Sequence, residues 1–147
     1  MQLTSHTDYS LRVLIYLGTL HASGRLATTK DLADAYRISR HHLRAVMHQL
    51  ARLGFVETMQ GRAGGCRLAR APEQIGVGEV VRSTEPNFNI VECFSPSTNS
   101  CRITRACALK HILAEAQRSF LATLDRYTLA DLVKQRRSVI RLLGIAA

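Results

Sequence analysis

The sequence predicts a mainly α-helical protein with one small β-hairpin, arranged as a winged helix-turn-helix domain followed by a long dimerisation helix. Three observations predict this fold: capped helices joined by a tight turn, a glycine-rich hairpin pattern directly after them, and an apolar seam near the C-terminus. The 147 residues suffice for one ordinary domain or for a small domain with an appendage. We assign residues 1–76 to the winged helix-turn-helix domain, 77–103 to a short linking helix and cysteine loop, and 104–147 to the dimerisation helix and C-terminal segment.

The first two helices are predicted from their capping residues. Ser5 and Asp8 form a Ser-x-x-Asp pattern that can cap a helix reaching to about residue 20, with apolar side chains on one face. Small residues then end this helix. Thr28 or Thr29 is placed to cap a second, shorter helix.

A third helix over 40–53 has the features of a DNA-recognition helix. Ser39 precedes it as a cap, and Gly54 follows it as a C-terminal glycine. Four apolar positions form its inward stripe: Leu43, Val46 or Met47, Leu50 and Leu53. The opposite face is polar and basic, so this helix and the one before it predict a helix-turn-helix.

Residues 55–69 predict a β-hairpin wing. Two short strand patterns, 55–59 and 66–69, flank a glycine-rich turn that carries Arg62. A plain structural turn is the alternative, but the position directly after a recognition helix favours a wing. Cys66 in the second strand is expected to be a small buried residue rather than a ligand.

The charge of the chain points to nucleic acid as a partner. Twenty basic residues against eleven acidic ones give a net charge of +9, and residues 1–70 hold ten basic and four acidic side chains, or +6 of this total. The alternative is a charged surface that only keeps the protein in solution. No apolar run is long enough to span a bilayer and no secretion signal is visible, so we expect no membrane partner and a cytoplasmic location.

The predicted DNA-binding residues cluster at the starts of the second and third helices and in the wing. They are Thr28, Thr29, Ser39, Arg40, His41, His42, Arg44, Gln60, Arg62, Gly64 and Gly65. Hydroxyls and backbone amides at helix starts suit phosphates, whereas Arg and His side chains suit phosphates or base edges.

Three cysteines in one polar segment predict a metal or cluster site. Seven residues separate Cys93 from Cys101, and five separate Cys101 from Cys107. Soft thiolate ligands suit iron-sulfur clusters, zinc or copper(I). Because zinc sites usually contain a closer cysteine pair, the spacing favours a cluster, although a structural zinc ion stays open. A fourth ligand would come from another residue or from a second chain.

The C-terminal third predicts helices beyond the cysteines. Thr104 is placed to cap a long helix through Arg126, and its apolar positions recur every three or four residues. This stripe can pack on the protein's own core or on a two-fold partner helix. Thr128 and Asp131 repeat the capping pattern, which predicts a further short helix.

Several motifs in the same order resemble a known bacterial family. They are Thr7-Asp8-Tyr9 with Leu11-Arg12, Leu50 with Gly54-Phe55-Val56, Gly61-Arg62-Ala63-Gly64-Gly65, Ile75 through Val81, the three cysteines, and Tyr127 through Leu132. The sequence resembles the winged-helix regulators that include IscR, and in particular their nitric-oxide-sensing repressors. The resemblance covers residues 1 to about 133. The chain departs from the family in its longer gap between Cys93 and Cys101 and in Gln60, where relatives often carry Arg.

The resemblance implies a homodimer with an iron-sulfur cluster, [4Fe-4S] or [2Fe-2S]. Its ligands would be Cys93, Cys101 and Cys107, with Asp8 from the partner subunit as the fourth, and Arg12 would lie beside the cluster. Asp8 as a simple helix-capping acid is the alternative.

The predicted function is therefore a homodimeric repressor that binds double-stranded operator DNA and releases it when nitric oxide reacts with the cluster. An IscR-like sensor of cluster supply or redox state and a zinc-stapled regulator are the alternatives. An enzyme is not expected, because no paired acid and base or nucleotide-binding loop is visible.

Overall fold

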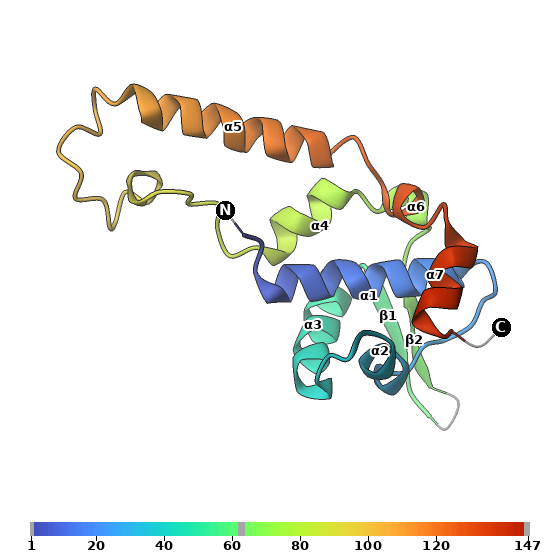
Figure 1. The fold of residues 1–147 in the computed structure, drawn as a ribbon. Coiled ribbons are helices and arrows are strands. Elements are labelled where there is room, and N and C mark those ends of the chain that lie inside the picture. Colours follow the sequence, from blue (N-terminus) through green and yellow to red (C-terminus); the bar gives the residue numbers. More distant parts are fainter. Residues whose placement is uncertain (1, 62–63, 146–147) are drawn as a thin grey trace.

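The computed structural model describes residues 2–61 and 64–145. It confirms the predicted fold class, with one antiparallel hairpin among helices (Figure 1). The N-terminal elements are α1 (Ser5–His21), α2 (Thr29–Tyr36), α3 (Arg40–Arg52), β1 (Val56–Met59) and β2 (Gly65–Leu68). The later elements are the 3-10 helix η1 (Pro72–Gln74), α4 (Val77–Thr84), the 3-10 helix η2 (Glu92–Phe94), α5 (Ala108–Leu124), α6 (Leu129–Leu132) and α7 (Arg136–Leu143).

Helix α1 is the centre of the hydrophobic core. Val13, Leu14 and Leu17 on α1 are almost fully buried, and α2, α3, α4, the hairpin, α6 and α7 all contact this helix. Apolar side chains removed from water supply most of the stability of such a core. Among the described residues, no helix has the length and apolar character needed to cross a membrane.

The capping residues explain where the first three helices begin. Of the two predicted caps of α2, Thr28 is the N-cap, and it forms a reciprocal capping box with Asp31. The Ser39 hydroxyl accepts a hydrogen bond from the His42 amide, as the sequence predicted. The predicted cap of α1 is wrong by one residue. Thr4 accepts the hydrogen bond from the Thr7 amide at 3.3 Å, so Ser5 is already the first residue of the helix.

Helix α3, the predicted recognition helix, packs through a stripe that differs from the prediction at one end. Leu43, Val46, Met47 and Leu50 are buried, whereas Leu53 is 36% exposed. Leu53 lies after the last helical residue as the C-cap, so its side chain no longer follows the buried face. Gly54 then turns the chain with φ of +74°, a conformation that favours glycine and confirms the predicted stop.

Helix α5 begins later than the sequence predicted. It starts at Ala108, with Cys107 as its N-cap, whereas the Thr104 hydroxyl donates a hydrogen bond to the Cys101 carbonyl at 2.7 Å. Thr104 therefore stabilises the preceding loop instead of capping the helix. None of the seventeen residues of α5 is buried, and Leu109 and Ile112 are 58% and 61% exposed.

The junction between α5 and α6 packs against the start of α4. The Val77 amide donates to the Tyr127 carbonyl at 2.9 Å, and the Leu129 amide donates to the Ile75 carbonyl at 2.8 Å. A Cβ atom on Gly78 would lie 1.9 Å from the Asp125 carboxylate, so this close approach requires glycine. Helix α5 is thus anchored to the core at its C-terminal end.

Of the last two helices, α6 was predicted from the sequence and α7 was not. Thr128 and Asp131 form the predicted capping box of α6. Helix α7 was not predicted, because Gln135 at its N-cap makes no side-chain capping bond that a sequence pattern would reveal. Its position is fixed by Ile140 and Leu143, which pack on the core, and by Arg136, whose Nε donates to the Thr19 carbonyl at 2.7 Å.

Candidate DNA-binding surface and cysteine loop

The helix-turn-helix presents a polar and basic surface. Arg37 turns the chain between α2 and α3 in the left-handed conformation, with φ of 54°. The predicted contact residues at the start of α3 are all exposed: Ser39, Arg40, His41, His42 and Arg44. Thr28 is exposed and Thr29 is partly exposed at the start of α2. These side chains can therefore reach a duplex.

The wing is tied to the domain at its second strand. Ala27 and Cys66 exchange backbone hydrogen bonds of 2.9 and 2.7 Å, which pairs β2 with the segment before α2. A Cβ atom on Gly65 would lie 2.8 Å from the Ala27 carbonyl, and one on Gly64 would lie 2.4 Å from the Met59 carbonyl. These two predicted DNA-binding glycines thus have a structural reason to be glycine. Gln60 is exposed at the end of β1.

Arg62, the predicted wing-tip contact, lies outside the described residues. Cys66, in contrast, is well described and only 3% exposed, and its thiol donates a hydrogen bond to the Ala27 carbonyl at 3.0 Å. Burial raises the pKa of this thiol to about 12, so it stays protonated near neutral pH. The prediction that Cys66 is a small buried residue is confirmed.

The other three cysteines lie along one extended loop between α4 and α5. Cys93 is in η2, Cys101 directly precedes a turn over residues 102–106, and Cys107 is the N-cap of α5. All three are partly exposed and none forms a disulfide. The hydrogen bonds around them stay mostly within the loop, for example from the Cys101 amide to Asn99 at 3.1 Å and from Ser100 to Glu92 at 3.4 Å.

The three thiols are ligands of the type that iron-sulfur clusters use, but they do not converge on one point within this chain. Free thiols on a loop with few outside contacts are suitable soft ligands. Within residues 2–61 and 64–145, however, no three His, Cys, Asp or Glu side chains are grouped so that they could hold a metal ion. Binding a cluster would therefore require the loop to rearrange, and the ligand assignment stays a prediction.

Asp8 and Arg12 lie one turn apart on α1. Their side chains form an ion pair of 2.7 Å, and each is 43% exposed. The Arg12 guanidinium also lies 5.9 Å from the centre of the Tyr9 ring and 6.0 Å from that of Tyr36. Burial raises the pKa of the Tyr36 hydroxyl to about 12, so this ring stays neutral beside the cation. Asp8 is thus accessible, but it is paired within its own helix.

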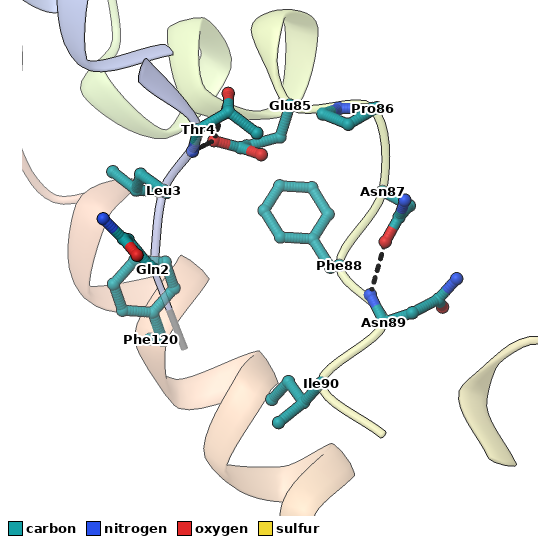
Figure 2. A pocket seen from close by; sticks show the side chains of 10 residues that line it. All are labelled: Gln2, Leu3, Thr4, Glu85, Pro86, Asn87, Phe88, Asn89, Ile90 and Phe120. Carbon is teal, nitrogen blue, oxygen red and sulfur yellow. Dashed lines mark hydrogen bonds between the residues drawn. The ribbon is translucent and has the colours of Figure 1, made fainter. Parts of the chain in front are cut away.

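Sequence reasoning missed the contacts made by the last turn of α4. Gln49 on α3 donates from Nε2 to the Ser83 carbonyl at 3.1 Å, and the Glu85 carboxylate accepts hydrogen bonds from Thr4. Figure 2 shows Glu85 and Thr4 at the edge of a cleft of about 230 Å³, whose walls include Phe88 and Phe120. Gln49 and Ser83 are 34 residues apart and belong to no motif, so no sequence signal joins them.

The fold and this surface define a winged helix-turn-helix DNA-binding regulator. The comparisons with known proteins agree, because a family model described as "Iron-dependent Transcriptional regulator" (Rrf2) matches residues 3–135. The chain belongs to the Rrf2 family. It is 52% identical over 143 residues to the HTH-type transcriptional regulator NsrR of Bacillus subtilis (strain 168), covering 97% of each chain. It is 53% identical over 133 residues to NsrR of Shouchella clausii, covering 90% of this chain and 89% of that one.

Solved structures share the fold. The cysteine regulator CymR of B. subtilis superposes with a TM-score of 0.74 at 22% identity, covering 92% of this chain and 98% of that one. The IscR of T. potens gives a TM-score of 0.70 at 23% identity, covering 92% and 88%. The family resemblance found in the sequence is confirmed by the Rrf2 family match and by the NsrR relatives. The chain is a transcriptional regulator of the NsrR/Rrf2 type, as its relatives are.

Proposed function

We propose that this chain is a homodimeric repressor that senses nitric oxide through an iron-sulfur cluster and then releases operator DNA. The observation that supports it most is the loop between α4 and α5, with three partly exposed cysteines and no disulfide. The loop lies between the DNA-binding core and the exposed helix α5. A change in its ligation can therefore alter how two DNA-binding domains are held relative to each other.

The DNA contacts would follow the usual winged-helix arrangement. Helix α3 would enter the major groove, where Arg40, His41 and His42 would meet base edges and Arg44 a phosphate or a base edge. Ser39, Thr28 and Thr29 would lie near phosphates, because helix starts favour anions. The wing, with Gln60, Arg62, Gly64 and Gly65, would follow the flanking backbone or minor groove.

The cluster would be held by Cys93, Cys101 and Cys107 together with Asp8 of the partner subunit. When bound, a [4Fe-4S] or [2Fe-2S] cluster would supply iron that nitric oxide can attack. On this chain, Asp8 would exchange its ion pair with Arg12 for ligation, which leaves the Arg12 cation near the negatively charged group. Release of the thiolates would return the loop to its internal hydrogen bonds.

The homodimer would form through α5. Its apolar side chains are exposed or only partly buried along the whole helix, which leaves a seam for a two-fold partner. Two recognition helices related by a two-fold axis would read an inverted-repeat operator. A coupling of about 1–3 kcal/mol between cluster and operator would change affinity by roughly 5- to 150-fold.

The direct test is anaerobic purification followed by operator binding before and after stoichiometric nitric oxide. We expect a coloured, iron- and sulfide-containing dimer that binds tightly and weakens on adding the gas. Cys101→Ser should remove both the colour and the gas response, whereas Cys66→Ser should keep both. A variant with all three loop cysteines replaced that still responds to the gas would contradict the proposal.

Two further measurements separate the alternatives. Zinc without iron or sulfide in the purified protein would favour a zinc-stapled regulator. A coloured dimer that responds to oxygen or iron supply but not to nitric oxide would favour an IscR-like sensor. Asp8→Ala should make the cluster easier to strip with a chelator, and an unchanged cluster would exclude the carboxylate as a ligand.

A further inference from the structure

The last turn of α4 and the residues after it contact three other helices. We call residues 82–88 the α4 junction. The face of α4 toward the core is buried through Val80, Val81 and Thr84, so the helix itself is fixed to the DNA-binding domain. Its free face and the residues that follow make polar contacts. Cys93, the first of the three cysteines of the loop, follows five residues after the junction.

The first contact of the α4 junction is to the recognition helix. Gln49 lies near the C-terminal end of α3, and its amide donates to the Ser83 carbonyl at 3.1 Å. Both side chains are only partly exposed. This is a direct hydrogen bond between the α4 junction and the helix that would enter the major groove.

The second contact of the α4 junction is to the start of α1. The Glu85 carboxylate accepts hydrogen bonds from the Thr4 amide at 2.7 Å and from the Thr4 hydroxyl at 3.1 Å (Figure 2). Thr4 is the N-cap of α1, and Asp8 lies in the first turn of that helix. Glu85 thus fixes the end of α1 that carries the proposed fourth ligand.

The third set of contacts is to α5. Arg82 forms a two-pronged ion pair with Asp125, with Nη2 and Oδ2 2.6 Å apart, and the Gln117 side chain donates to the Phe88 carbonyl. Movement of α5 or of the loop therefore acts first on residues 82–88. Residues 82–88 therefore connect the loop to α1, α3 and α5 through direct contacts.

We propose that the α4 junction transmits the state of the cysteine loop to the recognition helix, with Gln49 and Glu85 as positioning residues. This inference rests on the proposed function and deepens it. Glu85 links the loop to the position of Asp8, and the Ser83 carbonyl links the same segment to α3 through Gln49. Neither residue is among the proposed cluster ligands or the proposed DNA-contact residues.

The decisive experiment measures the ratio of operator Kd for cluster-free and cluster-loaded dimers. Gln49→Glu keeps the side-chain size but cannot donate to the Ser83 carbonyl, and Gln49→Ala removes the contact. We expect both variants to load the cluster with wild-type absorbance and to reduce the Kd ratio to about one third of the wild-type value or less. Gln74→Ala, which removes an exposed amide side chain in η1, is the matched control and should keep the wild-type ratio.

The second arm tests Glu85 by loss and rescue. Glu85→Ala should lower the Kd ratio, whereas Glu85→Gln keeps an acceptor oxygen for Thr4 and should restore most of it. Glu73→Ala, which removes an exposed carboxylate elsewhere, should change nothing. Wild-type Kd ratios in Gln49→Glu, Gln49→Ala and Glu85→Ala would overturn this inference and leave the proposed function standing. A wild-type dimer whose affinity does not depend on the cluster would overturn both.

Discussion

The two halves of the molecule differ in what holds them in place. The DNA-binding half, residues 2–84, packs its helices and hairpin around α1, with side chains such as Leu14 and Leu50 fully buried. The half that we propose as the sensor, residues 86–124, has no buried side chain in α5, and the hydrogen bonds of its loop are mainly internal. One half is complete in a single chain. The other half has apolar and thiol groups left over, which a second chain and an inorganic group would use.

Truncating one apolar side chain in each half should give the largest difference, which is in the free energy of unfolding. Leu50→Ala leaves a cavity in a fully buried site and should lower the free energy of unfolding by about 2–5 kcal/mol. Leu109→Ala should change the unfolding of the cluster-free monomer by less than about 0.5 kcal/mol, because Leu109 is 58% exposed. Urea denaturation at low protein concentration measures both. Equal losses would show that α5 packs on its own core.

The rate of thiol alkylation should also differ between the two halves, by a somewhat smaller factor. The pKa of Cys66 is raised to about 12, so at pH 8 its thiolate fraction is very small, and burial also blocks access. Cys93, Cys101 and Cys107 should react with iodoacetamide at least about 100-fold faster in the cluster-free protein. Mass spectrometry of peptides over time gives each rate. Rapid labelling of Cys66 would mean that the wing opens readily from the Ala27 contact.

Changing the reading surface should alter affinity without altering the response. Arg40→Ala should weaken operator binding about tenfold in the cluster-loaded and cluster-free forms alike, since Arg40 lies on the exposed end of α3. The salt dependence of operator binding by this variant should also fall if Arg40 contacts a phosphate. Titrations at several salt concentrations measure both effects. An Arg40→Ala dimer that binds as wild type but no longer responds to nitric oxide would break the division between the two halves.

The smallest expected effect concerns the cap of α2. Thr28→Ala removes the hydroxyl that accepts from the Asp31 amide and should cost about 1 kcal/mol of folding stability. Thr28→Ser keeps the hydroxyl and serves as the control. Chemical denaturation detects the difference. A neutral Thr28→Ala substitution would indicate that packing alone holds α2 in place.

The sequence predicted local features of the fold better than the contacts between distant elements. Ser39, Gly54 and the Thr128–Asp131 box mark element ends by chemistry that acts within a few residues, and the structure has each of them. Thr104 failed as a cap because its hydroxyl bonds to the Cys101 carbonyl, a choice that depends on the loop conformation. Helix α7 was missed because tertiary packing, rather than a cap, defines it.

In the candidate site too, local features were predictable from the sequence and long-range contacts were not. The basic face of α3 was visible as an amphipathic pattern, and Cys66 was separable from the other cysteines by its place in a strand. The Gln49–Ser83 and Glu85–Thr4 contacts were not visible, because they join residues 34 and 81 positions apart. Side-chain to backbone bonds of this range leave no periodic trace in a single sequence.

Because Gly78 closely contacts Asp125 at one end of α5, a small rotation of this helix about that end would move its other end by several ångströms. The helix is held at its Asp125 end, and Cys107 is at the opposite end. Seventeen residues of helix extend about 25 Å, so a swing of about 10° at the anchor would carry Cys107 through about 4 Å. Metal–ligand distances tolerate only about 0.2 Å. Gly78, which contacts the end of α5 opposite Cys107, would therefore help determine whether the Cys107 sulfur can reach the proposed cluster.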